Sequence, residues 1–378
     1  MTARVPAPLA TGRPPGVGPV TVIVGYGHAG SDLHHRCLRT LAARGVIPAG
    51  PVLAVDPCRP AELPTGTRWL PTIGAALDTI ASTAGASTAG VSTAGVSTAG
   101  AGRAGAGPAD AVFHVTTPVG EHAAVIAELL DAGARRIIVE KPVARTAAEA
   151  AAVAADAADA GARVVPVSVW PVSAVTERVV QLLAAGRIGT PGALCMEQSK
   201  PRFRRSVADV RASWGHRSAF EVELPHQVLL ALYLSEVLGA GPVEQVLESS
   251  GWQMLLPEGA LPGMGGARMR MRHASGLLST LVTDLTSPIR LRRLRIIGTE
   301  GAIVADYPIS AEDDYGQVWV SGERNRQVVA DAPLTAFLAR AYAHLTGDGP
   351  APAGGLDSHV AAIELIETAA GNALREVG

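Results

Sequence analysis

An apolar, β-branched run near the amino terminus breaks into three glycines spaced G-x-G-x-x-G, and this pattern most constrains the fold. The run covers residues 20–24 and precedes a segment with apolar residues at helical spacing, Ala29 to Arg44. The first glycine allows a tight turn out of a strand, the second lets a phosphate approach the backbone, and the third lets a helix pack closely on the strand. Free N–H groups at the helix start would face a pyrophosphate, with the helix dipole behind them. We expect this turn to contact a dinucleotide through Gly25, Gly27, His28, Ala29 and Gly30.

Three glycines are weak evidence in a chain that holds 42 of them, but the next segment supports the interpretation. A second apolar strand at residues 51–55 ends in Asp56. An acid at the tip of this strand can accept hydrogen bonds from ribose hydroxyls, and it favours NAD because a 2′-phosphate would face its charge. Arg59 follows closely and could hold such a phosphate, so NADP stays an alternative cofactor. Without a ligand, the same pattern would be a glycine-rich turn in an ordinary strand–helix–strand unit.

Length, charge and composition exclude several classes of protein. A chain of 378 residues is long for one core, so two domains are expected, and a net charge of −2 offers no positive excess to nucleic acid. The three cysteines fit neither a disulfide framework nor a metal site, which suits a reducing compartment. No run has the roughly 18 apolar residues that span a bilayer, and residues 1–18 resemble a flexible tail rather than a signal peptide. We therefore expect a cytoplasmic protein with a small-molecule substrate and no nucleic-acid, metal or membrane partner.

The first half of the chain alternates strands with helices. Gly133 is placed as the end of one helix, and Thr146 with Glu149 forms a capping box for the next. This alternation requires parallel strands with right-handed crossovers, which predicts an α/β Rossmann fold with a doubly wound parallel sheet. Residues 82–107 interrupt it with a repeated S-T-A-G motif, which we interpret as a mobile low-complexity insertion, with a lid as the alternative. Further strands are expected at residues 111–115, 136–139 and 163–169.

The second half consists mostly of strands, with helices at residues 172–185, 334–345 and 356–374. Residues 268–272 alternate arginine and methionine, as in a strand with one wet and one dry face. Successive strands with few helices between them predict an α+β domain with a large, mostly antiparallel open sheet, and we expect the active site in the cleft between the domains. The expected strands are residues 193–198, 243–249, 268–272, 277–285, 291–297, 302–306 and 317–320. The expected boundaries are 19–142 for the dinucleotide-binding domain, 143–170 for its end and the junction, 171–355 for the substrate and oligomerisation domain, and 356–378 for a carboxyl-terminal helix.

Polar residues directly follow two strands of the first domain. The carboxyl ends of parallel strands lie at the same edge of a sheet, so these residues should lie close together. Ligands bind at the carboxyl ends of strands in such sheets, so a lysine there can stabilise a developing alkoxide or polarise a carbonyl. Lys141 lies in this position, and Pro142 after it favours an extended backbone or a cis peptide bond. The alternative is a solvated lysine after an edge strand. The cofactor-binding candidates at this edge are Thr116, Thr117, Pro118, His122, Glu140 and Lys141.

The order of these motifs resembles the Gfo/Idh/MocA oxidoreductases, which include glucose–fructose oxidoreductase and inositol dehydrogenase. The matching pieces are V-G-Y-G-H-A-G at 24–30, T-P-V-G-E-H at 117–122, V-E-K-P-V-A at 139–144, L-L-A-A-G-R-I-G at 182–189 and I-I-G-T-E-G at 296–301. The resemblance implies that Lys141 is catalytic, that Thr117, Pro118 and His122 line the cofactor, and that Glu140 lies beside the nicotinamide. It also implies a homo-oligomer, a dimer or tetramer, joined through the open face of the second sheet.

The family places a catalytic histidine at the start of a helix in the second domain, and His226 opens the helical stretch 227–238 here. An imidazole titrates near neutral pH and can exchange a proton with a substrate oxygen. The alternative is a histidine that only caps its helix. Polyol-oxidising members have aspartates where this chain has Val222 and Leu229. Glu221 and Glu223 flank the first position, so one of these carboxylates could still reach the site, but nothing replaces the second. We therefore expect a substrate with fewer hydroxyls on that side than inositol.

Two further residues are candidate substrate contacts. Lys200 begins a basic cluster that could hold a carboxylate or phosphate, with a solvated or subunit-facing edge as the alternative. Trp170 could pack on the substrate or fill the hinge. The resulting hypothesis is an NAD(P)-dependent oxidoreductase that interconverts a secondary alcohol and a ketone on a sugar-derived or cyclitol-like metabolite, with Lys141 and His226 converging on one oxygen. The alternatives are an imine or thiazoline reductase of the same fold and a cofactor-sensing regulatory protein without turnover.

Overall fold

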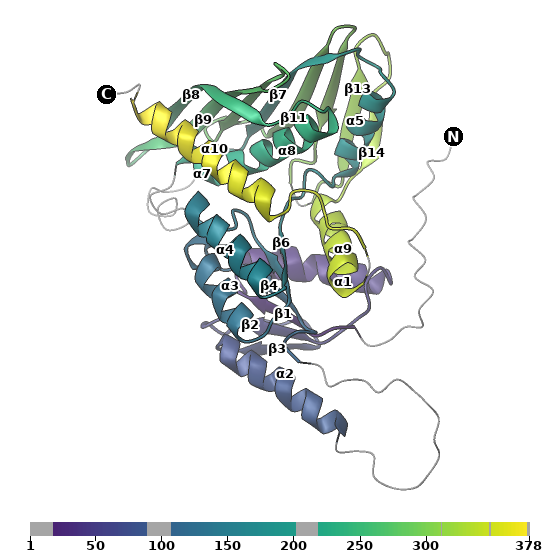
Figure 1. Cartoon of the computed structure of the whole chain (residues 1–378), viewed down its shortest axis with the longest axis vertical. Coiled ribbons are helices and arrows are strands. Elements are labelled where there is room, and N and C mark those ends of the chain that lie inside the picture. Colours follow the sequence, from purple (N-terminus) through teal and green to yellow (C-terminus); the bar gives the residue numbers. More distant parts are fainter. Residues whose placement is uncertain (1–17, 89–106, 202–217, 311, 348, 376–378) are drawn as a thin grey trace. The chain divides into compact units, whose positions relative to one another are not determined.

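A computed structural model describes residues 18–88, 107–201, 218–310, 312–347 and 349–375 (Figure 1). The chain forms two compact units that each draw on several segments. The first unit comprises Met1–Ala144, Ala151–Val167 and Leu338–Pro352, and the second comprises Arg145–Ala150, Ser168–Phe337 and Ala353–Gly378. The amino-terminal tail before residue 18 and the central part of the predicted insertion, residues 89–106, lie outside the described residues.

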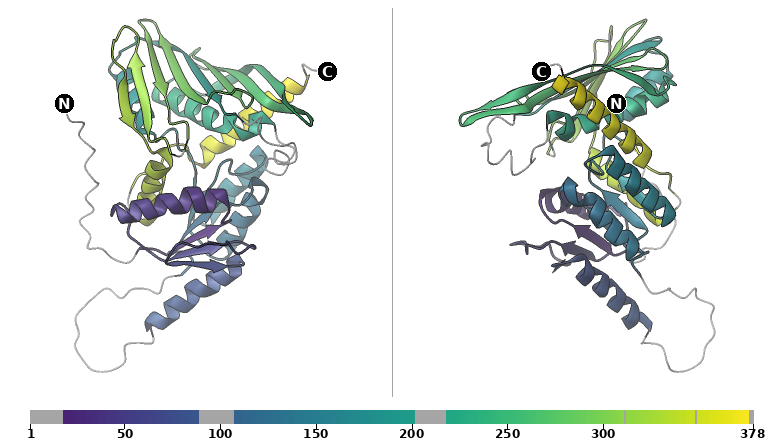
Figure 2. Two further views of the ribbon diagram at one scale, coloured as in Figure 1. Left: turned by 180° about the vertical axis from the view of Figure 1, so that it is seen from behind. Right: turned by 60° about the vertical axis from the view of Figure 1, so that its left-hand side comes forward.

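The first unit is built on a six-stranded parallel sheet in the order β3-β2-β1-β4-β5-β6. Every residue of β1 and β4 is buried, as expected for strands covered by helices on both faces (Figures 1 and 2). The order reverses direction between β1 and β4, which is the point where ligands bind in doubly wound sheets. The strands are β1 (Thr21–Val24), β2 (Val52–Val55), β3 (Thr67–Leu70), β4 (Val112–Val115), β5 (Arg136–Val139) and β6 (Arg163–Pro166).

The helices of this unit differ from the prediction in two places. The segment after the glycine turn begins as a π-helix, η1, and continues directly as α1, so the helix expected from Ala29 to Arg44 is confirmed, but its first part is a π-helix. Helix α2 extends to Thr88, into the repeat that we expected to be a loop from residue 82, because alanine has the highest helix propensity. The helices are η1 (Ala29–His35), α1 (Arg36–Ala43), α2 (Ile73–Thr88), the 3₁₀ turn η2 (Val119–Glu121), α3 (His122–Asp131), α4 (Ala147–Asp159) and α9 (Pro333–Thr346).

The predicted signals at the end of α3 and at the start of α4 are confirmed. Gly133 follows α3 with φ at +89°, a conformation that favours glycine. At the start of α4 the Thr146 hydroxyl accepts from the Glu149 N–H at 3.2 Å, and the Glu149 carboxylate accepts from the Thr146 N–H at 3.3 Å. These two bonds are the capping box expected from the sequence.

The second unit contains an eight-stranded sheet in the order β14-β13-β12-β11-β7-β10-β9-β8. All pairs are antiparallel except β7 with β10, which confirms the predicted mostly antiparallel sheet. In β9 the methionines Met269 and Met271 are buried while Arg268 and Arg272 are exposed, as their alternation predicts. The strands are β7 (Pro191–Ser199), β8 (Val243–Leu256), β9 (Gly259–His273), β10 (Leu278–Asp284), β11 (Leu291–Gly298), β12 (Ala302–Asp306), β13 (Tyr315–Val320) and β14 (Gln327–Ala330).

Helices of the second unit pack on one face of this sheet, with α5 against β12 to β14, α8 against β10 and α10 against β8 (Figure 1). The first turn of α8 includes His226, because α8 starts at Leu224 after the N-cap Glu223. The prediction that His226 lies at the start of its helix is therefore confirmed, although the helix begins at Leu224 rather than near residue 227, and the alternative that His226 caps the helix was wrong. These helices are α5 (Ala174–Ala184), α7 (Ala219–Val222), α8 (Leu224–Val237) and α10 (Leu356–Arg375).

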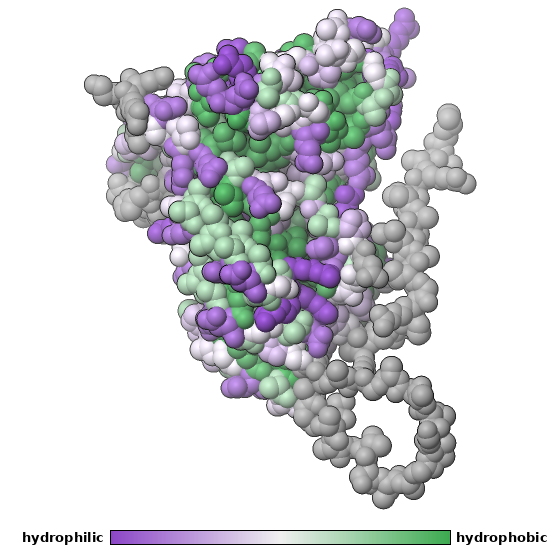
Figure 3. Space-filling model, viewed as in Figure 1, coloured by the Kyte–Doolittle hydropathy of each residue, from purple (hydrophilic) through white to green (hydrophobic). Residues whose placement is uncertain are grey.

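Apolar side chains are exposed at several strand and loop positions of the second unit. Leu255 of β8, Val328 of β14 and Ile289 before β11 are between 66% and 71% exposed. In the view of Figure 3, hydrophobic and hydrophilic residues are interspersed over both units. In the part of the chain that the structure describes, every helix is too short or too polar to cross a membrane.

Candidate functional site

The glycine turn has the backbone geometry that a phosphate cradle needs. Gly25 has φ at +87°, and a Cβ there would lie 2.6 Å from the Thr117 backbone nitrogen. A Cβ on Gly30 would overlap the carbonyl oxygen of Gly25, whereas a Cβ on Gly27 would meet nothing within 4 Å. Gly25 and Gly30 are therefore required by packing, and the open space at Gly27 fits the approach of a dinucleotide pyrophosphate.

Asp56 at the tip of β2 is tied to this turn. Its carboxylate accepts the backbone N–H groups of Tyr26 and Cys58, each at 2.9 Å. The aspartate thus holds the glycine turn against the second strand, a role that the sequence analysis missed. A carboxylate has about four lone-pair sites, so ribose hydroxyls can still donate to it. Arg59, the candidate for a 2′-phosphate, lies over the ring of Trp69, 5.8 Å from its centroid.

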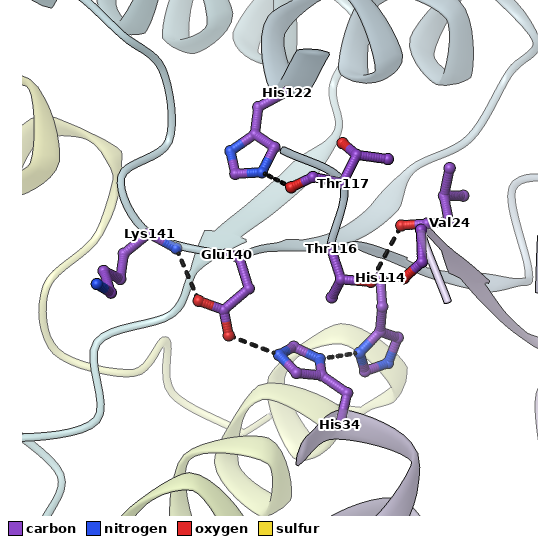
Figure 4. Close-up of polar contacts among 9 residues, drawn as sticks. Val24, His34, His114, Thr116, Thr117, His122, Glu140 and Lys141 are labelled. Atoms are coloured by element: carbon purple, nitrogen blue, oxygen red, sulfur yellow. Dashed lines mark hydrogen bonds and ion pairs between the residues drawn. The ribbon is translucent and has the colours of Figure 1, made fainter. Parts of the chain in front are cut away.

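Two loops at the same sheet edge are joined by a buried histidine. His122 lies between the carbonyl oxygens of Thr117 and Pro142, with its ring nitrogens at 2.8 and 2.9 Å. The hydroxyl of Thr116 donates at 3.0 Å to Val24 O or at 2.6 Å to Gly25 O, which ties β4 to the glycine turn (Figure 4). His122 is 1% exposed, so its contacts indicate a residue that positions the loops rather than one that faces the cofactor.

One buried oxygen at this edge has no partner. The hydroxyl of Thr117 makes no hydrogen bond within the described structure, although it follows the end of β4 next to the glycine turn. An unpaired buried hydroxyl costs about 1–3 kcal/mol, so its presence at this point fits a site completed by a ligand. Together with the open glycine, it shows that the residues present fit a bound dinucleotide.

Lys141 follows β5, and its backbone is held by its neighbour. The Lys141 N–H donates to the Glu140 carboxylate at 3.1 Å, the Lys141–Pro142 peptide bond is cis, and the lysine side chain points away from that of Glu140 (Figure 4). The other Glu140 oxygen accepts from His34 Nε2 at 2.9 Å. Burial would raise the pKa of Glu140, but the hydrogen bond and charge of His34, with Lys141, hold that pKa below its ordinary value. An ionised carboxylate therefore lies beside the lysine.

The second unit groups the predicted substrate residues into two neighbourhoods. In the first, the indole of Trp170 is stacked between two rings, with centroids 5.6 Å from His226 and 5.2 Å from Tyr307. Burial raises the pKa of Tyr307, and its hydroxyl hydrogen-bonds Thr176 at 2.7 Å. The stack fixes the plane of the His226 ring, so Trp170 acts on the histidine through packing.

In the second neighbourhood, Lys200 donates to both oxygens of Glu223, at 2.9 and 2.7 Å. Gln198 Nε2 donates to the same carboxylate, and Thr283 pairs with Gln198 across β7 and β10. The side-chain oxygens of Gln198, Gln227 and Thr283 are buried and have no partner within the described structure. Sequence analysis missed these three residues, because their grouping depends on the pairing of β7 with β10 and on the packing of α8.

The predicted site residues thus form one group in each unit. The cofactor candidates gather at the carboxyl edge of the parallel sheet around the glycine turn, and the substrate candidates lie around the start of α8. Lys141 belongs to the first group and His226 to the second. The convergence of these two residues on one oxygen stays a prediction. The arginines predicted beside Lys200, at positions 202, 204 and 205, lie outside the described residues.

Comparison with known proteins supports the family assignment. Residues 104–168 match the model of the Gfo/Idh/MocA family, described as an oxidoreductase family with an NAD-binding Rossmann fold. None of the curated proteins matches the chain. Among solved structures, a 3-ketoreductase from Actinomadura kijaniata in complex with NADP and TDP-benzene has 13% identity and a TM-score of 0.68, over 94% of this chain and 97% of the other.

Two further solved structures extend the comparison. The aldose-aldose oxidoreductase from Caulobacter crescentus has 16% identity and a TM-score of 0.66, over 96% of this chain and 98% of that one. The UDP-N-acetylglucosamine 3-dehydrogenase from Acidithiobacillus ferrooxidans has 16% identity and a TM-score of 0.63, over 93% and 97%. This chain therefore combines the fold of these proteins with a match of residues 104–168 to the family model, which confirms the predicted resemblance to the Gfo/Idh/MocA oxidoreductases.

Proposed function

We propose that this protein is an NAD(P)-dependent oxidoreductase that interconverts a secondary alcohol and a ketone on a sugar-derived or cyclitol-like metabolite. The observation that carries the proposal is the position of Lys141 at the carboxyl edge of the parallel sheet, held by an ionised Glu140, on the edge that also has the open glycine turn. Asp56 at the tip of β2 supports NAD as the preferred cofactor.

The bound nicotinamide would accept or supply the hydride, and the residues of this chain would handle the oxygen and its proton. The Lys141 ammonium would stabilise negative charge on the substrate oxygen during oxidation or polarise the carbonyl during reduction. His226, with its ring plane held by Trp170, would exchange the oxygen-bound proton. The hydrogen bond from its own N–H to the Glu140 carboxylate fixes the Lys141 backbone for this role.

The second unit favours a hydroxylated substrate. The buried oxygens of Gln198, Gln227 and Thr283 have no partner in the described structure, and hydroxyl groups of a ligand would satisfy them as donors. An imine substrate without hydroxyls would leave these oxygens unpaired, at about 1–3 kcal/mol each. This observation ranks a polyhydroxylated ketone or alcohol above the imine reductase alternative.

Substitution of Lys141 tests the proposal. Lys141→Met should lower kcat by at least about 100-fold, since removal of one oxyanion-stabilising group costs about 10²–10³ in rate, while NAD binding changes little. Arg145→Met, at an exposed cation after the same strand, should keep full activity. Turnover is measured as nicotinamide absorbance with a panel of sugars, cyclitols and their keto forms. Full activity of Lys141→Met would remove the catalytic role, and cofactor binding without turnover of any alcohol, ketone or imine would favour the regulatory alternative.

The exposed apolar residues of the second sheet support a homo-oligomer. Leu255 and Val328 lie on β8 and β14, at opposite ends of the strand order, and Ile289 lies before β11. Burial of such residues against a second copy would remove apolar surface from water. Light scattering of the purified protein should give a mass of at least two chains, and Val328→Lys with Leu255→Lys should lower it.

A further inference from the structure

Behind Glu140, a line of buried side chains crosses the first unit. Glu140 is bonded to His34 Nε2 at 2.9 Å, and His34 Nδ1 is bonded to His114 Nδ1 at 2.8 Å (Figure 4). His114 Nε2 contacts the hydroxyl of Tyr342 at 3.0 Å, which contacts the hydroxyl of Thr21 at 2.8 Å. We call these five residues the relay. It joins the segment after β5 to η1, β4, α9 and the first residue of β1, and all five residues belong to the first unit.

The relay is enclosed by protein except at one end. His34 and His114 have no exposed surface, Tyr342 is 2% exposed, and the Glu140 side chain is 18% exposed. The facing ring nitrogens of the two histidines are in direct hydrogen-bond contact, and the described residues contain no cluster suited to a metal ion. Solvent therefore reaches the relay at Glu140, the end that lies next to Lys141.

The hydrogen-bond geometry allows two states that differ by one proton. With both imidazoles neutral, His34 donates from Nε2 to Glu140, so its Nδ1 must accept from His114. His114 Nε2 then accepts from Tyr342, whose oxygen accepts from Thr21. If His34 gains a proton, its Nδ1 donates to His114, His114 donates to Tyr342, and Tyr342 donates to Thr21. The two states thus differ by one proton in total: His34 has one more, His114 has changed the nitrogen that carries its proton from Nδ1 to Nε2, and every hydrogen bond beyond His34 is reversed but still made.

Burial and neighbouring charges determine which groups of the relay can change protonation between its two states. Burial lowers the pKa of His114 well below its ordinary value, and the positive charges of His34 and His35 lower it further, which keeps His114 neutral in either state. Burial also raises the pKa of Tyr342, so its hydroxyl keeps its proton. The charged groups that face His34 are Glu140 and Lys141 from the segment after β5, with His114 from β4 and His35 from its own helix.

We propose that the relay stores one proton behind the catalytic edge, taking it up when the nicotinamide is reduced and releasing it when the nicotinamide is oxidised. This inference rests on the proposed function, because it needs a nicotinamide beside Glu140. The oxidised ring carries a positive charge that the reduced ring lacks, and a nearby positive charge disfavours a protonated His34. His34, His114 and Tyr342 are therefore positioning and proton-holding residues that act through Glu140.

The proton balance of the reaction is consistent with this direction. Oxidation of a secondary alcohol by NAD⁺ gives a ketone, NADH and one proton. At equilibrium the relay holds one more proton in the NADH state, on His34 Nδ1, and has lost it to solvent in the NAD⁺ state, while His114 carries its own single proton on Nε2 in the first state and on Nδ1 in the second. The relay itself transfers no electrons, and no covalent bond other than N–H and O–H bonds changes in it.

Calorimetric titration of the full-length protein with NAD⁺ and with NADH tests the proposal. Each titration is run in two buffers of different ionisation enthalpy between about pH 5 and 8, the range in which histidine titrates, and gives the number of protons released on binding. We expect NAD⁺ to release more protons than NADH, with a difference that peaks within this range and approaches one proton. Equal proton numbers for the two forms across the range would overturn the inference.

Variants identify the relay as the source of the difference. Tyr342→Phe and Thr21→Val each remove the acceptor that the protonated state needs at its far end, so either should reduce the difference to less than half. Ser279→Ala is the matched control, since it removes a buried hydroxyl bonded to a histidine ring, that of His273, in the second unit and should leave the difference unchanged. A full difference in a folded Tyr342→Phe or Thr21→Val protein would overturn the inference.

The outcomes also separate this inference from the proposed function. If neither form of the cofactor binds, the proposed function and the relay proposal both fail. If both forms bind with equal proton release, only the relay proposal fails. Ring ¹⁵N chemical shifts of His34 and His114 give an independent measurement, because they should show one protonated histidine with NADH and two neutral histidines with NAD⁺ near the midpoint pH.

Discussion

Each unit of this protein buries a polar cluster, and the two clusters differ in whether their hydrogen bonds are complete. In the first unit, the relay from Glu140 to Thr21 pairs each group with the next. In the second unit, Lys200 and Glu223 are paired, but the side-chain oxygens of their neighbours Gln198, Gln227 and Thr283 have no described partner.

This difference separates a structural role from a ligand-binding role. A buried polar network stabilises a fold when every member is satisfied, and an unpaired buried group costs free energy. The relay can therefore hold Glu140 in place without a ligand. The cluster around Glu223 has acceptors without a partner in the described part of the chain, as the proposed binding of a hydroxylated substrate requires.

The largest expected effect comes from breaking the closed cluster in its middle. His114→Leu leaves His34 Nδ1 and Tyr342 each without one partner. At about 1–3 kcal/mol for each buried group left unpaired, the free energy of unfolding should fall by about 2–6 kcal/mol. Urea denaturation measures this loss, and a decrease below about 1 kcal/mol would show that the cluster is not closed as described.

The second-largest effect on the free energy of unfolding is expected from acid. Burial lowers the pKa values of His114, His35 and His273, so the unfolded chain binds protons that the folded chain excludes. Stability should therefore fall as the pH drops below 6.5, the ordinary histidine value, by up to about 1.4 kcal/mol per pH unit for each such histidine. The depressed pKa of Glu140 adds a further loss below pH 4.5. Thermal unfolding between pH 8 and 4 measures the slope, and an exposed-site variant, His28→Gln, serves as the control.

A smaller effect is expected at the end of the relay. Tyr342→Phe removes one hydroxyl that bridges His114 and Thr21, and the free energy of unfolding should fall by about 1–2 kcal/mol, as for loss of one buried hydrogen-bonded group. Tyr307→Phe, which loses a similar bond to Thr176, should cost a comparable amount. No loss in Tyr342→Phe would mean that its hydroxyl is not part of the buried network.

The smallest effect on stability is expected in the open cluster. Gln198→Leu removes an oxygen that is already unpaired and one bond to Glu223, which keeps Lys200 as a partner. Unfolding free energy should change by less than about 1 kcal/mol, while KM for the substrate rises about tenfold, the equivalent of one hydrogen bond. A loss of stability as large as that of His114→Leu, with unchanged KM, would contradict the contrast between the clusters.

Local signals in the sequence were sufficient for the doubly wound parallel sheet and for the backbone at the cofactor edge. The β-branched strands, Gly25, Gly30 and the Thr146 cap act through neighbours in the chain or through general rules of parallel sheets. The pairing of His34 with His114 could not be predicted, because the two residues are 80 positions apart and meet only when η1 packs on the sheet.

The long β8–β9 hairpin shows a second limit. The alternation of arginine and methionine led us to expect β9 only from residue 268, but it begins at Gly259 and includes Gly265 and Gly266, which have low strand propensity. A Cβ on Gly266 would overlap the ring of Trp252 on β8, so the glycines are required for close packing between the two strands. Tertiary packing, which a single segment does not encode, overrode the local preference.

The π-helix at Ala29–His35 makes the first unit sensitive to the length of the chain at this point. A π-helix holds one residue more per hydrogen-bonded turn than an α-helix, so deletion of one residue there would allow an ordinary α-helix. The residues after the deletion would rotate by about 100° about the helix axis, which would carry His34 away from Glu140 and His114. Relatives with one residue fewer between the glycine turn and α1 should therefore lack both histidines of the pair, or keep them without the contact.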